Sequence, residues 1–279
     1  MVNTAMVAIA VSSMLFHEYP CEEIFSYVEE AGLDGIEFWV ETPDFWLRGC
    51  PPEALSGCIA RHPTLSHPTI HAPVLDLNPC SINPRVAIAS VEYALEAVSL
   101  GAEVESPAVT VHPGRRTAKR TPSDADFYRF ERYLDLLEGA HDRTGVPVSI
   151  ENMEQRENSL LCTPAGVAEL LEAEPWLGFT LDVAHALARS PDEALRYVDV
   201  AVDRLCNVHV SGVGHGMVHI PPSRDGNVAP VLAALRDSGY TGPLTLEIED
   251  RTFTGLLSSE EKIILLMREA EWLRSVWDR

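Results

Sequence analysis

The sequence predicts an α/β fold, a (β/α)8 TIM barrel in a single domain. Short runs rich in β-branched residues recur along the chain, helix-length segments separate them, and the runs number eight. Because each helical crossover returns the chain to the same end of the sheet, we expect parallel strands. The 279 residues fit the about 250 that such barrels commonly use, and we assign residues 1–279 to one domain.

The first expected strand is a buried run near the N-terminus, not a signal peptide, because no Lys or Arg precedes it and Ser12 and Ser13 interrupt it. It is followed by SSMLFHEYP and not by a Gly-rich phosphate loop, which disfavours an open doubly wound sheet. The eight expected strands are AMVAIAVSS (5–13), GIEFWV (35–40), TIHAPV (69–74), AVTVHPG (108–114), VPVSIEN (146–152), GFTLDV (178–183), CNVHVSG (206–212) and PLTLEIE (243–249).

Start signals mark several of the intervening helices. Ser123 precedes apolar residues at helical spacing, and Ser258 with Glu261 forms a capping-box pattern. Pro51 and Pro52 mark a further helix entrance.

The composition of the chain disfavours two classes of partner, nucleic acids and membranes. The formal charge of −21 opposes attraction to a polyanion, so DNA is not a favoured partner. No stretch approaches the about 20 apolar residues of a membrane span. The six cysteines are scattered, which is typical of a reducing compartment, and we expect a cytoplasmic protein. The sequence leaves the oligomeric state open.

Six consecutive strands carry a potential metal ligand, and most carry it at the strand end. These residues are His71, His112, Glu151, Asp182, His209 and Glu247. The carboxyl ends of barrel strands converge on one face, so these side chains are expected to meet. Burying carboxylates and imidazoles together is costly without a compensating cation, and Zn²⁺, Mn²⁺ and Fe²⁺ prefer this ligand mixture. The pair Asp182 and His185 is assigned to the same site.

The motifs HAPVLDLNP, VTVHPG, SIEN, GFTLDVAHA, NVHVS, HIPPSRDGN and LTLEIE occur in this order between His71 and Glu249. Over this span the chain resembles the endonuclease IV and xylose-isomerase-like TIM-barrel superfamily. The resemblance implies the fold and a divalent-metal site of one to three ions, with zinc favoured and manganese or iron as alternatives. In the isomerase and epimerase branch, it implies one metal held by Glu151, Asp182, His209 and Glu247. In the endonuclease IV branch, it adds His71, His112, His185 and His219 and implies three zinc ions.

One position departs from the endonuclease IV pattern. That branch has an Asp-x-His pair after the seventh strand, and here Met217 takes the place of the Asp before His219. A thioether is a poor substitute for a carboxylate at Zn²⁺ or Mn²⁺. Recruitment of Asp225 from the same loop, a weaker ion, and direct substrate binding by the histidines are the alternatives.

The resemblance of the histidine set to the endonuclease IV pattern implies hydrolysis of a phosphodiester, in a small sugar-phosphate or nucleotide-like substrate. In this hypothesis His71 and His112 bind one metal, Glu151 bridges, and a second metal is bound by Asp182, His209 and Glu247. The alternative is a sugar or sugar-phosphate isomerase or epimerase with a single metal, in which Glu151 and Glu247 are catalytic and exchange a proton. A second alternative is an AP endonuclease acting on abasic DNA.

Four residues are candidates for substrate binding. Arg115 and Arg116 begin the basic segment RRTAKR directly after HPG, where a phosphate contact and a solvated loop are equally good interpretations. Glu37 and Trp39 belong to GIEFW, and we expect them to face the pocket. Trp39, with Phe45 and Trp46, is either a stacking surface or ordinary packing.

Overall fold

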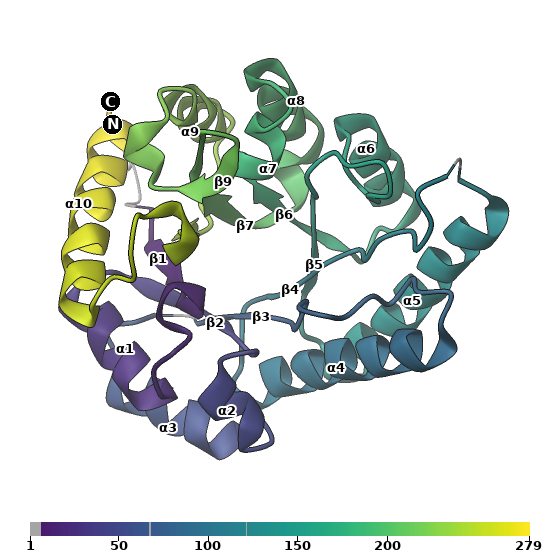
Figure 1. Ribbon diagram of the computed structural model, residues 1–279, viewed down its shortest axis with the longest axis horizontal. Coiled ribbons are helices and arrows are strands. Elements are labelled where there is room, and N and C mark those ends of the chain that lie inside the picture. The colour runs from purple at the N-terminus through teal and green to yellow at the C-terminus, as the bar shows by residue number, and fades with distance from the viewer. Residues whose placement is uncertain (1–6, 67, 121) are drawn as a thin grey trace.

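The computed structural model describes residues 7–66, 68–120 and 122–279 and confirms the (β/α)8 barrel (Figure 1). Eight parallel strands close in the order β1-β10-β7-β6-β5-β4-β3-β2. They are β1 (Ile9–Ser12), β2 (Gly35–Trp39), β3 (Thr69–His71), β4 (Val109–Val111), β5 (Val148–Glu151), β6 (Gly178–Asp182), β7 (Leu205–Val210) and β10 (Leu244–Leu246). Residues 5 and 6 of the expected first strand lie outside the described residues.

Helices surround the barrel (Figure 1). They are α1 (Cys21–Glu30), α2 (Pro43–Leu47), α3 (Pro52–Arg61), α4 (Pro84–Glu103), α5 (Asp124–Thr144), α6 (Pro164–Ala173), α7 (Val183–Leu187), α8 (Pro191–Ala201), α9 (Val228–Asp237) and α10 (Ser259–Trp277). Capping boxes at Ser123 with Asp126 and at Ser258 with Glu261 begin α5 and α10, and Pro52 begins α3. The expected start signals are therefore confirmed.

A hairpin that we did not predict follows β7. Its strands are β8 (Gly212–Gly214) and β9 (Met217–Ile220), and they pair antiparallel outside the barrel. From the sequence we expected a loop over the segment from Met217 to Asp225. Gly212 is needed for close packing, because a Cβ at this position would lie 2.7 Å from the Cβ of Asp225.

Inside the barrel, beneath the strand-end residues, lies a layer of buried polar side chains that are joined by hydrogen bonds. Thr110 donates to Glu37 at 2.9 Å, and Asn207 donates to the same Glu37 oxygen at 3.0 Å. Thr180 contacts both Thr110 (3.1 Å) and Ser149 (2.7 Å) through its hydroxyl. These contacts satisfy buried polar groups below the mouth of the barrel.

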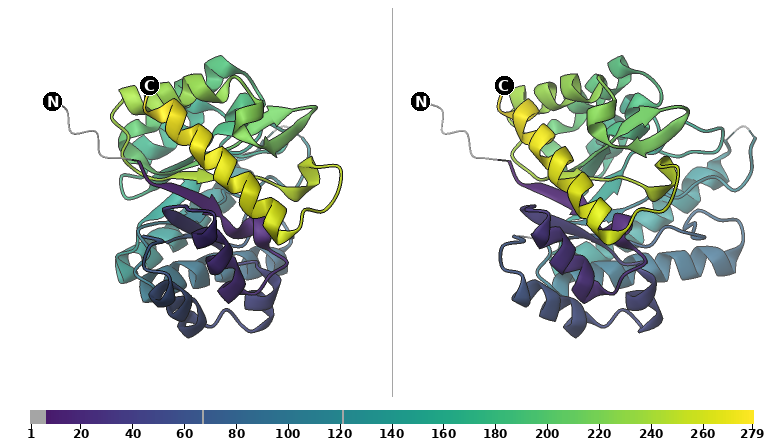
Figure 2. Two further views of the ribbon diagram at one scale, coloured as in Figure 1. Left: turned by 90° about the vertical axis from the view of Figure 1, so that its left-hand side faces the viewer. Right: turned by 60° about the vertical axis from the view of Figure 1, so that its left-hand side comes forward.

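Lys262 ties the last helix to the first strand connection. Its fully buried ammonium group donates to the Leu15 carbonyl at 2.7 Å and pairs with Asp250 at 2.8 Å and with Glu18. The views from the side show α10 running across β1 at this seam (Figure 2). Among the described residues, no helix combines the length and apolar character needed to cross a bilayer.

Candidate metal centre

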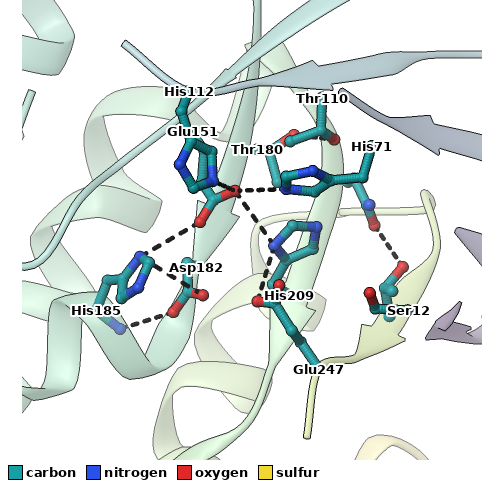
Figure 3. Close-up of polar contacts among 12 residues, drawn as sticks. Ser12, His71, Thr110, His112, Glu151, Thr180, Asp182, His185, His209 and Glu247 are labelled. Carbon is teal, nitrogen blue, oxygen red and sulfur yellow. Dashed lines mark hydrogen bonds and ion pairs between the residues drawn. The ribbon is translucent and has the colours of Figure 1, made fainter. Parts of the chain in front are cut away.

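The six strand-end residues lie together at the carboxyl end of the barrel (Figure 3). With His185 and His219 they form three groups in which the ligand atoms lie within 4.8 Å of one another. The groups are Glu151–Asp182–His209–Glu247 (the central group), His71–His112–Glu151 (the His71 group) and Asp182–His185–His219 (the His219 group). Glu151 and Asp182 are each shared by two groups.

The central group contains buried polar atoms that the chain itself does not satisfy. His209 Nδ1 lies 3.1 Å from Glu247 Oε2 and 3.5 Å from Glu151 Oε2. In the described part of the chain, Asp182 Oδ2, His209 Nδ1 and Glu247 Oε2 have no hydrogen-bond partner. Such atoms are costly to bury, and a divalent cation would satisfy all three at once. The donor set therefore fits a divalent metal ion.

Asp182 is placed by the turn that follows β6. It caps α7, and its Oδ1 accepts from the His185 backbone N–H at 2.6 Å, which leaves Oδ2 for the centre. The Asn152 side chain accepts from the Asp182 N–H at 2.8 Å and donates to its carbonyl at 3.0 Å. Asn152 thus fixes the strand end, a role that we did not assign from the sequence although it directly follows Glu151.

The His71 group lies on one side of Glu151. His112 Nε2 and His71 Nε2 lie 3.1 and 3.4 Å from Glu151 Oε2. His71 Nδ1 donates to the Ala72 carbonyl at 2.8 Å, so its other ring nitrogen faces the carboxylate.

The His219 group lies on the other side of the central group. His185 Nδ1 and His219 Nδ1 lie 3.6 and 3.8 Å from Asp182 Oδ2. His219 adopts φ 60 on β9, a left-handed conformation that non-glycine residues rarely hold and that occurs often at functional sites.

No fourth ligand joins the His219 group among the described residues. Met217, which stands where the endonuclease IV pattern has an Asp, begins β9 and is not part of the His219 group. Asp225 is not recruited, because its Oδ2 accepts from the Val213 N–H at 3.0 Å and its Oδ1 from Asn227. The His219 group therefore offers fewer protein ligands than the central group.

The buried carboxylates and imidazoles strongly shift one another's pKa. Burial disfavours the charged imidazoles, but Glu151 and Glu37 raise the pKa of His71 to about 9, and Asp182 and Glu151 raise that of His185 to about 10. Burial opposes ionisation of Glu151 too, yet His112 and His209 hold its pKa well below the usual value.

Two members of the His219 group are instead governed by desolvation. Burial raises the pKa of Asp182 to about 6, although His185 and His219 act against it. Burial also lowers the pKa of His219 to about 4, although Asp182 opposes the shift. His219 is therefore neutral near pH 7, which is the protonation state that a metal ligand requires.

Glu37 lies beneath the centre and contacts a ligand. It is fully buried on β2, and its Oε2 lies 2.7 Å from His209 Nε2. A carboxylate at this nitrogen orients the ring so that Nδ1 faces Glu151 and Glu247, and it favours Nε2 as the protonated nitrogen when the ring is neutral. We expected Glu37 to face the pocket and bind substrate, but its position indicates an orienting role.

The other three candidates for substrate binding differ in how far their side chains are exposed to solvent. Arg116 is buried and donates to the carbonyls of Glu157 and Arg120, so it holds its loop together and has no free guanidinium for a phosphate. Arg115 remains exposed. Trp39 is buried at 6% exposure, which limits it as a stacking surface.

The two other aromatic residues pack against the protein. Phe45 is part of the core, and Trp46 packs against Tyr93 of α4 with ring centroids 4.6 Å apart and ring planes tilted by 37°. For Phe45 and Trp46, ordinary packing is therefore the better interpretation.

Comparisons with known proteins agree with this architecture. The model of the xylose isomerase-like TIM barrel family matches residues 25–276. An uncharacterized protein of Methanocaldococcus jannaschii, MJ1188, is 30% identical over 274 residues, which cover 97% of this chain and 100% of that protein. A second protein of the same organism, MJ1311, is 30% identical over 200 residues, which cover 69% of this chain and 67% of that protein.

Similar solved structures share the fold at lower identity. A D-tagatose 3-epimerase-like protein has a TM-score of 0.79 at 21% identity and covers 97% of both chains. The 3-keto-D-glucoside 4-epimerase YcjR of E. coli has a TM-score of 0.78 at 18% identity and covers 96% of this chain and 99% of its own. An L-ribulose 3-epimerase has a TM-score of 0.77 at 18% identity and covers 98% and 95%.

Replacing Glu37 with Gln tests the orienting role. The amide nitrogen would donate to His209 Nε2 and force the proton onto Nδ1, so we expect metal affinity to fall by about 10- to 100-fold in a chelator competition assay. Thr180→Val is the matched control, because its hydroxyl contacts Thr110 and Ser149 of the same interior layer and no ligand. Equal affinities in wild type and Glu37→Gln would exclude the role.

Metal binding should release protons and tighten as the pH rises. Burial disfavours the charged form of His209, the imidazole of the central group, but Glu247 and Glu37 raise its pKa well above the usual value. A metal needs a neutral imidazole, so affinity falls as the pH is lowered. Between about pH 6.5 and 8.5 we expect about a tenfold gain in affinity per pH unit for each proton displaced. Titration calorimetry in two buffers of different ionisation enthalpy counts these protons. A pH-independent affinity would contradict this assignment of protonation states.

Proposed function

The chain belongs to the xylose isomerase-like TIM barrel family, and on that premise we propose that it is a divalent-metal-dependent enzyme that isomerises or epimerises a small sugar. The observation that carries the proposal is the central group, in which Glu151 and Glu247 approach His209 Nδ1 from β5 and from the end of β10. Sugar epimerases among the structural neighbours support the same reaction class.

Two carboxylates are what a proton exchange at carbon requires. One removes a proton from the carbon beside a carbonyl, and the other returns a proton to it or to the neighbouring atom. His209 holds the pKa of Glu247 below its usual value despite burial, and Glu151 is shifted in the same direction, so both are ionised and able to accept a proton near neutral pH.

The protein groups around these carboxylates hold the reacting geometry. When bound, a divalent cation would act as a Lewis acid that polarises a carbonyl or hydroxyl oxygen. Asp182, fixed by Asn152, and His209, oriented by Glu37, would hold that cation together with the two glutamates. The depth of the site excludes bulk water, because Glu151 and His209 are at most 1% exposed.

Phosphodiester hydrolysis is the second candidate, and one observation favours it. The His71 and His219 groups add ligands on both sides of the central group, more than a single ion needs. Several ions would brace phosphate oxygens and lower the pKa of a bound water. We rank this reaction second, although the histidine pattern of the sequence favours it, because the similar structures include several sugar epimerases. Abasic DNA is disfavoured further by the charge of −21.

Hydrogen exchange with solvent tests the main proposal without knowledge of the product. Metal-loaded protein is incubated in D₂O with ketopentoses, ketohexoses and their phosphates, and deuterium next to the carbonyl is followed by NMR. We expect exchange in wild type and a loss of about 10²- to 10⁴-fold in Glu151→Gln and Glu247→Gln. Glu138→Gln, the same change at an exposed position on α5, is the control and should exchange normally.

Two results together would refute isomerisation. Absence of exchange with every sugar, together with cleavage of bis(p-nitrophenyl) phosphate by the metal-loaded protein, would transfer the assignment to hydrolysis.

Metal content and a His112→Ala variant separate the two candidates. Isomerisation with one metal predicts that the variant keeps one ion per chain and still exchanges hydrogen, because His112 lies outside the central group. Hydrolysis predicts the loss of one ion and of most phosphodiester cleavage. Elemental analysis and both activity assays on the same preparations give the answer, with His141→Ala on α5 as a control for replacing a histidine away from the barrel mouth.

A further inference from the structure

A cavity of about 440 Å³ lies directly beside the candidate metal centre. The segments that follow β3, β4 and β5 line it together with residues of α4 and α5, and His112 belongs both to this wall and to the His71 group. Its volume is within the range of about 300 to 1,000 Å³ that is common for small-molecule sites. The cavity thus adjoins the His71 group, which shares Glu151 with the central group.

The side chains that line the cavity carry a net positive charge, whereas the chain as a whole is strongly negative. Arg115, Lys119 and Arg156 line it, and Glu154 is the one acidic residue among the described residues that do so. Glu154 pairs with Arg156. Within the described ranges, the guanidinium of Arg115 and the ammonium of Lys119 have no ionic partner. Two uncompensated cations thus border one cavity in a chain with a formal charge of −21.

The backbone that carries Arg115 is rigidly held although its side chain is exposed. Its N–H donates to Asn78 Oδ1 at 3.0 Å, and it forms a bridge with Ser159 across the cavity wall. The preceding Gly114 has φ +74, and a Cβ there would lie 2.8 Å from the same Asn78 oxygen. The next residue, Arg116, is buried and donates to the Glu157 carbonyl, which holds the backbone on the other side of Arg115. This framework positions an otherwise free guanidinium at the cavity.

We propose that this cavity binds the phosphate group of a phosphorylated sugar, with Arg115 and Lys119 as its ligands; the inference rests on the proposed function and names its substrate class. Arginine offers a planar fork that matches two phosphate oxygens, and lysine adds a point charge. An uncharged sugar would leave both cations without a partner. The phosphate end lies beyond His112, and the sugar carbonyl faces Glu151 and Glu247.

Binding measurements test this without requiring turnover. Dissociation constants of metal-loaded protein are measured by titration calorimetry for D-ribulose 5-phosphate, D-ribulose and inorganic phosphate, in wild type, Arg115→Gln and Lys119→Gln. We expect the phosphorylated sugar to bind at least tenfold more tightly than the free sugar, and each substitution to remove about tenfold of that affinity. Arg143→Gln, an exposed cation on α5 outside the cavity, is the matched control and should change nothing.

The alternative results are distinguishable. Phosphate binding that is equally tight in both variants would place the anion on the metal and overturn the inference. Equal affinity for D-ribulose and D-ribulose 5-phosphate would overturn it too. Arg115-dependent binding of the phosphorylated sugar without hydrogen exchange would uphold the cavity assignment and refute isomerisation alone.

Discussion

Charge compensation at the mouth of the barrel is the constraint on which the site depends. Glu151 and Asp182 are almost completely buried, and each lies close to several imidazoles. An unpaired buried carboxylate would be strongly destabilising, so these positions require either protonated histidines or a cation. The raised pKa of His71 and the lowered pKa of Glu151 are two sides of this mutual stabilisation. A bound divalent ion would take the place of those protons as the source of positive charge.

Residues that adjoin the candidate ligands determine how those ligands are oriented. Glu37 forms an ion pair with His209 and accepts hydrogen bonds from Thr110 and Asn207, so contacts across several strands set the orientation of this imidazole. Asn152 does the same for Asp182 from the adjacent strand. Residues outside the three groups therefore set the positions of the candidate ligands His209 and Asp182.

Much of the fold was predictable because periodicity and strand count are local properties of the sequence. The convergence of His112, Glu151 and Asp182 followed from barrel topology. The roles of Glu37 and Arg116 did not, because whether a polar side chain faces a ligand or a neighbouring backbone depends on packing between distant segments. The β8–β9 hairpin was missed because its glycines are as typical of loops as of tight strand pairs.

The seam between β1 and β10 has a consequence for folding during synthesis. Lys262 contacts Leu15 across 247 residues of sequence, and β1 pairs with β10 at the same seam. At about 5 to 20 residues per second, one edge of β1 waits on the order of 10 to 50 s for its partner strand. During that interval the nascent chain carries an open sheet edge of the kind that templates aggregation. The rate of translation sets how long this edge of β1 stays exposed, and chaperones can protect it during that time. The exposure is long because contacts so distant in sequence form slowly.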